Sequence, residues 1–342
     1  MHAAYHHGPW HNSGVILVMR PGAPKADLDA VLRALDELNV KRHVFRGKER
    51  VVITSLSETT PPPEVLAALE ILPGVDRVTP LTSPYRLASR EGHPEPSVVQ
   101  VGGVAFGRDR FTIVAGPAHV TDPTRLRAVA KEVAPNGAAI LRVGGNGASL
   151  SERELEGLMP AALPVMAEVG EPADVLQVAA MADLLHVAAH NMQNRPLLRA
   201  VGRARRPVLV ERGLSATVEE WLGAAEQVLS AGNFDVVLCE RGIRTYEADR
   251  QATLDLSAIP VLKRLSHLPV VVDVSQGTGH RYLIRPMALA AAAAGADGLV
   301  VEVHDAGVSD LMEGPGSLTL GEFADLTAAL RPLLGALGRT LS

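Results

Sequence analysis

The stretch Asp235–Val–Val–Leu–Cys–Glu–Arg–Gly–Ile–Arg–Thr245 decides the fold, because an apolar run in it passes directly into charged residues and a polar turn. This pattern is typical of a buried parallel strand that carries charge at its carboxyl end. It recurs in Pro207–Gly213, Pro269–Gln276 and Gly298–His304. Parallel strands that all end in ionisable residues predict a shared edge where these side chains meet, and we take this edge as the candidate functional surface.

Eight apolar strands alternate with helical segments in the larger part of the chain, after a hairpin predicted at Val98–Phe106. The predicted strands lie near Phe111–Ala115, Ala138–Arg142, Pro164–Val169, Asp183–Ala188, Pro207–Glu211, Asp235–Glu240, Pro269–Val274 and Gly298–His304. The predicted helices include Pro123–Val133, Ser151–Leu163, Val218–Ala231, Ser257–Leu265, Ile284–Ala294 and Leu320–Leu337. Strict alternation predicts an α/β fold, a (β/α)8 TIM barrel over residues 98–342. A doubly wound open sheet is the alternative, but the first turn, Ala115–His119, lacks the glycine spacing of that fold.

A small ferredoxin-like α+β domain is predicted over residues 14–82. Its predicted elements are strand Gly14–Met19, helix Lys25–Asn39, strands Arg42–Phe45 and Arg50–Ser55 around a turn at Gly47–Lys48, helix Pro63–Leu72 and strand Val75–Val78. The order βαββαβ is that of the ferredoxin-like arrangement. We expect this domain to serve assembly or regulation, because its sequence holds no cluster of candidate acids, bases or metal ligands.

The remaining segments are a tail and a linker. Residues 83–97 are polar and rich in proline, which predicts a linker between two domains. Residues 1–13 are expected to form a mobile tail; their four histidines leave a metal-binding tail as the alternative.

Composition narrows the class of protein. With 47% hydrophobic and 3% aromatic residues, the core of this 342-residue chain has to be aliphatic. A net charge of −5 without a long basic run argues against a nucleic-acid surface. The single cysteine, Cys239, excludes an internal disulfide and fits a reducing compartment. No apolar stretch reaches the roughly 18 residues of a membrane helix, and no secretory signal is evident, so we expect a cytoplasmic protein without a membrane partner.

The motifs resemble those of one family in content and order. They are Ala115–Gly–Pro117, Asn191–Met–Gln–Asn194, Arg212–Gly213, Cys239–Glu–Arg–Gly–Ile–Arg–Thr245, Leu254–Asp–Leu–Ser257, Ser266–His–Leu–Pro269 and Val301–Glu–Val–His304. This set is similar to that of the type I 3-deoxy-D-arabino-heptulosonate-7-phosphate (DAHP) synthases that carry an N-terminal ferredoxin-like regulatory domain. The resemblance covers nearly the whole chain from about residue 14.

The resemblance implies a divalent metal held by Cys, His, Glu and a further acidic residue. At these positions the chain has Ala118, Gln276, Glu302 and Glu313. Alanine cannot ligate, and an amide oxygen is a weak substitute for imidazole. We therefore expect the metal site of the family to be absent or weak, and we predict no cofactor.

The resemblance also implies a pocket for phosphoenolpyruvate, to be condensed with erythrose 4-phosphate. Arg142 and Arg241 match its arginines, whereas His190 replaces an arginine and Glu211 replaces a lysine. The Lys–Pro–Arg–Thr loop of the family is missing, and the shorter segment Gly145–Leu150 takes its place. DAHP synthesis is therefore not expected. The glycines at 144, 145 and 147 fit an anion cradle or a flexible turn equally well.

Two sets of candidate site residues follow. The predicted substrate-binding residues are Arg142, Arg212, Glu240, Arg241, Asp273 and Gln276. The predicted catalytic residues are Glu211, His190, Glu302 and His304, and His119 lies on the same rim. For Arg142 and Arg241 we favour ligand binding over ion pairing, and for Arg244 we favour ion pairing. Glu211 either neutralises nearby arginines or serves as a general base, and the sequence leaves both roles open.

Three functions remain. The preferred one is a diverged, metal-independent enzyme acting on a small carboxylated or phosphorylated metabolite of the shikimate or chorismate pathway, or of a derived specialised pathway. The alternatives are a non-catalytic homologue that senses a metabolite or regulates a partner enzyme, and a genuine DAHP synthase. The expected partners are the anionic metabolite and further copies of the chain in a homodimer or homotetramer, with a pathway enzyme as a further candidate.

Overall fold

Two compact units make up the protein in this computed structural model. The structure describes residues 14–38, 42–46, 51–55, 62–81, 85–118, 123–144, 163–247, 252–304 and 316–342. One unit comprises Met1–Glu95 with Leu265–His267, and the other comprises Pro96–Arg264 with Leu268–Ser342. The predicted turn at Gly47–Lys48 and most of the helix predicted at Ser151–Leu163 lie outside the described residues.

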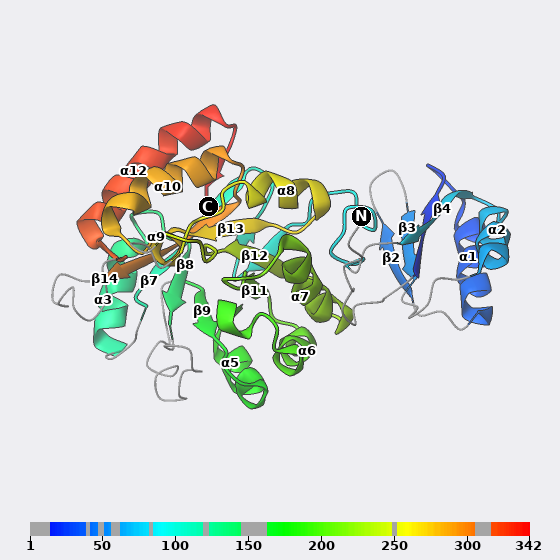
Figure 1. The fold of residues 1–342 in the computed structure, drawn as a ribbon, viewed down its shortest axis with the longest axis horizontal. Coiled ribbons are helices and arrows are strands. Elements are labelled where there is room, and N and C mark those ends of the chain that lie inside the picture. Colours follow the sequence, from blue (N-terminus) through cyan, green and yellow to red (C-terminus); the bar gives the residue numbers. More distant parts are fainter. Residues whose placement is uncertain are drawn as a thin grey trace. The chain divides into compact units, whose positions relative to one another are not determined.

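The smaller unit is an antiparallel sheet with two helices on one face (Figure 1). Its elements are β1 (Gly14–Met19), α1 (Lys25–Glu37), β2 (Arg42–Arg46), β3 (Val51–Ser55), α2 (Pro63–Glu70) and β4 (Val75–Leu81). The strand order β2-β3-β1-β4 confirms the ferredoxin-like prediction. Alternate residues of β1, among them Val15 and Leu17, join Leu28 and Val31 of α1 in one core, because side chains two apart on a strand share a face.

The larger unit is a closed parallel barrel, as predicted. Its strands are β7 (Arg110–Gly116), β8 (Ile140–Val143), β9 (Val165–Glu168), β10 (Leu184–Val187), β11 (Val208–Glu211), β12 (Val236–Glu240), β13 (Val270–Asp273) and β14 (Gly298–His304). Each pairs in parallel with the next, and β14 pairs with β7, which closes the ring. Two-residue strands β15 (Leu318–Thr319) and β16 (Thr340–Leu341) extend β14 and β7.

Helices surround this barrel (Figure 1). They are α3 (Pro123–Val133), α5 (Val175–Met181), α6 (Arg195–Ala204), α7 (Val218–Ser230), α8 (Ala258–Leu265), α9 (Val274–Thr278), α10 (Arg281–Ala293) and α12 (Leu320–Ala336), with 3-10 turns at Pro172–Asp174 and Ala189–Asn191. Reciprocal capping boxes begin α7, between Thr217 and Glu220, and α12, between Thr319 and Glu322. No helix among the described residues is long and apolar enough to cross a membrane.

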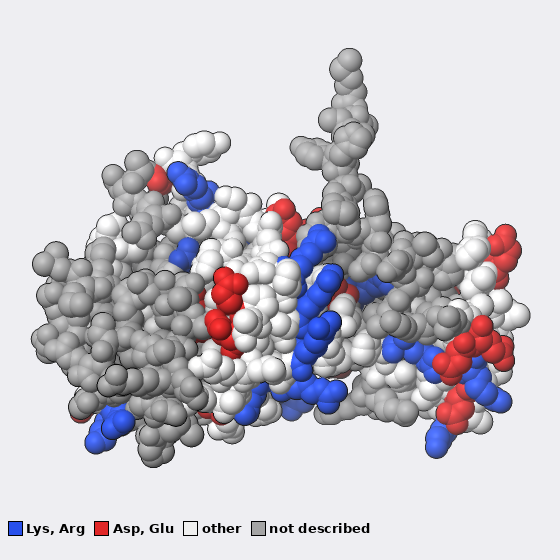
Figure 2. All heavy atoms as spheres, turned by 90° about the horizontal axis from the view of Figure 1, so that it is seen from below, with Lys and Arg blue, Asp and Glu red and all other residues white. Residues whose placement is uncertain are grey.

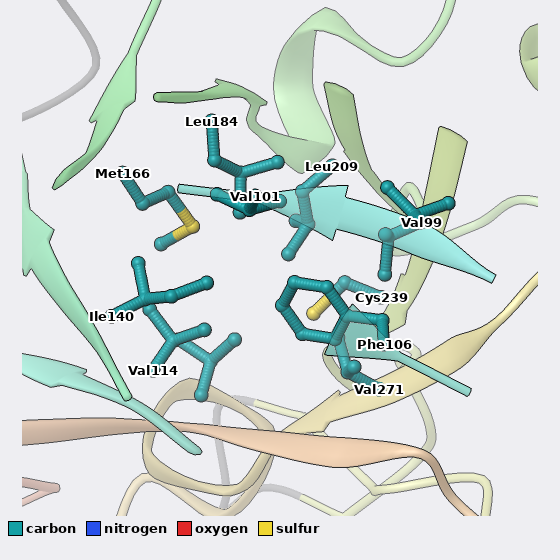
Figure 3. Close-up of a cluster of buried hydrophobic side chains, with 12 residues drawn as sticks. Val99, Val101, Phe106, Val114, Ile140, Met166, Leu184, Leu209, Cys239 and Val271 are labelled. Carbon is teal, nitrogen blue, oxygen red and sulfur yellow. The ribbon is translucent and has the colours of Figure 1, made fainter. Parts of the chain in front are cut away.

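A hairpin closes one end of the barrel. Strands β5 (Val99–Val101) and β6 (Val104–Phe106) pair in an antiparallel manner. Val99, Val101 and Phe106 form one buried cluster with inward side chains from all eight barrel strands (Figure 3). The strand residues of this cluster lie mainly towards the amino ends of the strands. The barrel interior is therefore filled with apolar groups on that side, which leaves the carboxyl ends for a site.

Candidate functional site

A ring of ionisable side chains lies directly above the apolar cluster. In six strands the apolar inward residue is followed two positions later by an ionisable one, and these pairs are Ile140/Arg142, Met166/Glu168, Leu184/His186, Leu209/Glu211, Val271/Asp273 and Val300/Glu302. Residues two apart on a strand face the same way, so the ionisable members also point into the barrel. All of them are buried. Charge buried at this depth is tolerated only when it is paired, so the pairs define the site.

Arg142 and Glu302 form the first pair. Arg142 Nη1 donates to Glu302 Oε1 at 2.7 Å, and the two residues are only 4% and 6% exposed. The Nε2 amide of Gln276 donates to the same carboxylate oxygen at 2.9 Å. The backbone amide of Glu302 in turn donates to Ser275 Oγ at 2.9 Å, which fixes the strand end against α9.

His186 and Glu211 form the second pair. His186 Nε2 lies 2.9 Å from Glu211 Oε1. The other carboxylate oxygen accepts the backbone N–H of Ala189 at 3.0 Å and lies 3.8 Å from Arg241 Nε. Burial alone would raise the pKa of Glu211, but the facing imidazole and nearby arginines outweigh it and lower that pKa to about 2. Burial alone would lower the pKa of His186, but Glu211 and Glu168 outweigh it and raise that pKa.

Gln276 links the two pairs. The guanidinium of Arg241 donates to its amide oxygen, while its amide nitrogen donates to Glu302. Asp273 holds Gln276 in place, because its Oδ1 accepts the backbone N–H of Gln276 at 2.8 Å at the start of α9. Burial raises the pKa of Asp273 to about 6, although Arg142 counteracts part of the effect.

These side chains surround a cavity of about 420 Å³. Its lining residues are Ala118, Arg142, Glu168, His186, Ala188, Ala189, His190, Glu211, Leu214, Ser215, Arg241 and Gln276. The volume suits a small metabolite, and the wall combines apolar carbon with a few fixed charges, as ligand sites usually do.

Comparison with known proteins then decides the family. The model of the DAHP synthetase I family matches residues 95–333, and that of the DAHP synthase ferredoxin-like domain matches residues 15–83. The chain belongs to the DAHP synthetase I family.

Individual relatives are similar over long spans. Phospho-2-dehydro-3-deoxyheptonate aldolase of Thermotoga maritima is 37% identical over 336 residues, which are 95% of this chain and 99% of the relative. A crystal structure of the Thermotoga maritima DAHP synthase matches with a TM-score of 0.74 and covers 97% of this chain and 100% of that one. A 2-dehydro-3-deoxyphosphooctonate aldolase of Nitrobacter winogradskyi is 29% identical and covers 68% of this chain and 91% of its own length.

The predicted site residues of this DAHP synthetase I family member fall into three groups. Arg142, His190, Glu211, Arg241 and Gln276 line the cavity. Glu302 and Asp273 do not line it, but each contacts a residue that does. His119, Glu313 and the segment 145–150 lie outside the described residues.

Arg212, Glu240 and His304 depart from the prediction, since none of them lines the cavity. Arg212 Nη1 donates to Glu240 at 2.9 Å and to Asp255 at 3.0 Å, so this pair braces the barrel wall in place of the predicted substrate contact. His304 is buried with its Nε2 3.5 Å from a guanidinium nitrogen of Arg281, away from the cavity wall. Arg244 is exposed.

Two charged residues of the wall, Glu168 and His186, were missed. Each lies inside a predicted strand, and an apolar residue two positions earlier was the signal that it points inwards. Each is the sole ionisable residue of its described strand, and a lone charge in a buried strand requires a partner on a neighbouring strand.

The family implies a divalent metal, and the described residues do not fit one. Ala118 lines the cavity but offers no side-chain donor. Both polar atoms of the Gln276 amide bind other side chains, and Glu302 Oε1 already faces the guanidinium of Arg142. Among the residues that the structure describes, no three His, Cys, Asp or Glu side chains are grouped so as to hold a metal ion. A cation at Glu302 would have to displace a guanidinium and an amide.

Proposed function

We propose that this chain is an enzyme that binds a small anionic metabolite in the cavity and acts without a divalent metal, and that DAHP is not its product. The observation that carries the proposal is the pairing inside the cavity wall. Arg142 faces Glu302, His186 faces Glu211, and Arg241 lies between Gln276 and Glu211. The positive charge that would receive a phosphate and a carboxylate together is already balanced by protein groups.

Glu211 has the largest effect on which substrate is accepted. By resemblance it stands where the family has a lysine, so the local charge differs by two units. Its lowered pKa keeps it ionised at neutral pH. A carboxylate fixed in the wall repels a ligand with several negative charges, and the repulsion is strong because the surroundings are largely shielded from water. A pKa of about 2 also makes Glu211 a poor general base, so we assign it the role of orienting and charging His186.

His186 is the group we propose for proton transfer. It lines the cavity, and its partner Glu211 favours the imidazolium form. An imidazolium aimed at a bound substrate serves as a general acid, and its conjugate base takes a proton back in a later step. The proposal adds His186 to the residues predicted from the sequence.

Synthesis of DAHP itself is the second candidate, and the comparisons favour it over the first. The Thermotoga maritima relative that carries this name is 37% identical over nearly its whole length. Arg142, Arg241 and Glu302 also match family positions by resemblance. In this reading the two arginines would hold phosphoenolpyruvate, and Glu211 would have to be neutralised by His186 during binding.

Metal content and turnover separate the two candidates. The purified protein, before and after EDTA treatment, is analysed by inductively coupled plasma mass spectrometry. It is then incubated with phosphoenolpyruvate and erythrose 4-phosphate, with and without Mn²⁺. We expect no stoichiometric metal, no seven-carbon product and no effect of EDTA on thermal stability. Formation of DAHP at a rate that rises with Mn²⁺ would establish the second candidate and reject the first.

A further inference from the structure

Three buried polar atoms of the cavity wall lack a hydrogen-bond partner among the described residues. They are Glu168 Oε1, Arg142 Nε and Arg241 Nε. An unmade hydrogen bond in a buried site costs about 1–3 kcal/mol, so a ligand that satisfies these atoms gains affinity. Glu168 accepts only, and an arginine nitrogen donates only. The complementary ligand therefore presents a donor to Glu168 and an acceptor to Arg241.

The order of strands places these two requirements at opposite ends of the cavity. Glu168 ends β9 and Arg241 follows β12, with β10 and β11 between them. Neighbouring strands lie about 4.8 Å apart, so the two groups belong to different sides of the wall. The His186–Glu211 pair lies between them, on β10 and β11. A ligand that meets both ends carries an acidic group at one end and a hydroxyl at the other.

The charge balance limits the acidic group to a single negative charge. Three cationic groups, Arg142, His186 and Arg241, stand against three anionic ones, Glu168, Glu211 and Glu302. Arg241 is the most open of the paired cations, with 17% of its side chain exposed and its ion pair to Glu211 stretched to 3.8 Å. Its forked donors suit one carboxylate. A phosphate would bring a second charge beside Glu168 and Glu211 with no further cation to offset it.

The rest of the wall is hydrocarbon. Ala118, Ala188, Ala189 and Leu214 contribute methyl and methylene groups. This surface suits a carbon ring or short chain between the two polar ends.

We propose that the cavity binds a hydroxylated monocarboxylic acid that carries no phosphate, with its carboxylate on Arg241 and a hydroxyl donated to Glu168. This inference rests on the proposed metal-free function and specifies the class of metabolite for the same site. Glu168 selects for the hydroxyl, and His186 lies between the two anchors, next to the carbon skeleton.

Isothermal titration calorimetry with matched acids tests the proposal. The probes are quinate and 4-hydroxycyclohexanecarboxylate, with cyclohexanecarboxylate as the acid without hydroxyl and phosphoenolpyruvate as the phosphorylated acid. We expect at least one hydroxylated acid to bind about tenfold or more tightly than cyclohexanecarboxylate, the gain of one hydrogen bond to a charged group. Phosphoenolpyruvate is expected to bind more weakly than that acid.

Two variants and their controls assign the ends. Glu168→Gln should remove the tenfold preference for the hydroxyl, whereas Glu171→Gln, an exposed carboxylate three residues later, should keep it. Arg241→Gln should weaken binding of every acid, whereas Arg244→Gln, which is exposed, should not. Arg241→Lys gives the same test with the charge kept and the fork removed, should Arg241→Gln fail to fold.

Failure of this inference and failure of the proposed function give different results. Equal binding of acids with and without hydroxyl, no binding of either hydroxylated acid, or tighter binding of phosphoenolpyruvate without metal would overturn the substrate class while the metal-free function stands. Binding of any probe only after Mn²⁺ is added would overturn the proposed function itself.

Discussion

The decisive residues of this protein are buried ions that bind one another across neighbouring strands. A buried ion pair gives little net stability compared with apolar groups of the same size, because both ions lose water. Breaking such a pair is costly, since one charge is left behind. The contacts between Arg142 and Glu302 and between His186 and Glu211 therefore govern specificity and protonation more than they govern the fold.

Replacing Glu211 should change the protonation of His186. In the Glu211→Gln variant the attraction that raises the pKa of His186 is lost, and burial then lowers that pKa below its ordinary value of about 6.5. An NMR titration of the imidazole signals measures this, and His186→Gln identifies the signal. An unchanged His186 pKa in Glu211→Gln would contradict the assigned pairing.

The same pair should make stability depend on pH in a predictable direction. The lowered pKa of Glu211 stabilises the fold above about 4.5, and this contribution is lost as the pH falls towards about 2. The raised pKa of His186 stabilises it below about 6.5, and this contribution is lost as the pH rises through the folded-state value. Urea denaturation should show the largest difference between the wild type and Glu211→Gln at pH 4.5–6.5. A difference that keeps growing above pH 8 would exclude this account.

Arg142 and Glu302 should behave as one unit in a double-mutant cycle. Arg142→Met leaves a buried carboxylate without its cation and should cost about 3–5 kcal/mol of unfolding free energy. Glu302→Gln in the same chain should recover part of that loss, with a coupling of about 0.5–3 kcal/mol. Chemical denaturation of the two single variants and the double variant measures the coupling. Additive losses would show that the two side chains do not interact.

Among the elements, α6 carries an electrostatic burden. Arg199 and Arg203 are exposed and lie one turn apart, and Figure 2 shows Lys and Arg side chains in a band across one face of the molecule. Like charges four residues apart destabilise a helix by a few tenths of a kcal/mol. The apolar side of α6, with Leu197, Leu198 and Val201 buried, holds it on the barrel in spite of this repulsion.

Reversing one of these charges should stabilise the protein. Arg199→Glu removes the repulsion and creates a Glu-to-Arg pair with Arg203, and should raise the free energy of unfolding by about 0.5–1 kcal/mol at low salt. Arg199→Gln removes only the repulsion and should give about half of that gain. Thermal denaturation at low salt and at 1 M salt measures both, and the gain should fade at high salt. A gain that persists at high salt would point to a cause other than charge.

The sequence predicts these elements well where apolar runs are long and bounded by turn residues. The strand from Val236 is one example, and α3 has the predicted bounds, Pro123–Val133. The helix predicted to begin at Ile284 begins instead at Arg281, because His280 rather than a residue nearer Pro286 forms its N-terminal boundary. Strands β15 and β16 were not predicted, since two residues show no periodicity and pair only because the barrel is already present.

The site was harder to predict than the fold, for a physical reason. Strand ends are visible in the sequence, and this is why Arg142, Glu211 and Gln276 were found. Which ion binds which depends on the stagger of neighbouring strands, and this stagger has no signature in a single strand. Arg212 was therefore assigned to the substrate although it binds Glu240, and His186 was overlooked although it binds Glu211.

For the larger unit as a whole, the β5–β6 hairpin is part of the core rather than an appendage. Phe106 is fully buried in the cluster shared with the barrel strands (Figure 3). Phe106→Ala should cost about 3–5 kcal/mol of unfolding free energy, because it leaves a large cavity that the surrounding strands cannot fill. Val104→Ala, at a partly buried position of the same hairpin, should cost clearly less. Urea denaturation compares them, and equal losses would mean that the hairpin does not pack as a plug.

This plug also has a kinetic consequence. Because it closes the barrel below the charged ring, the reactant and whatever is made from it share a single opening at the carboxyl ends of the strands. A molecule that has reacted has to depart before the next can arrive. A slowly released product would therefore act as a competitive inhibitor, and turnover would be limited by release rather than by chemistry.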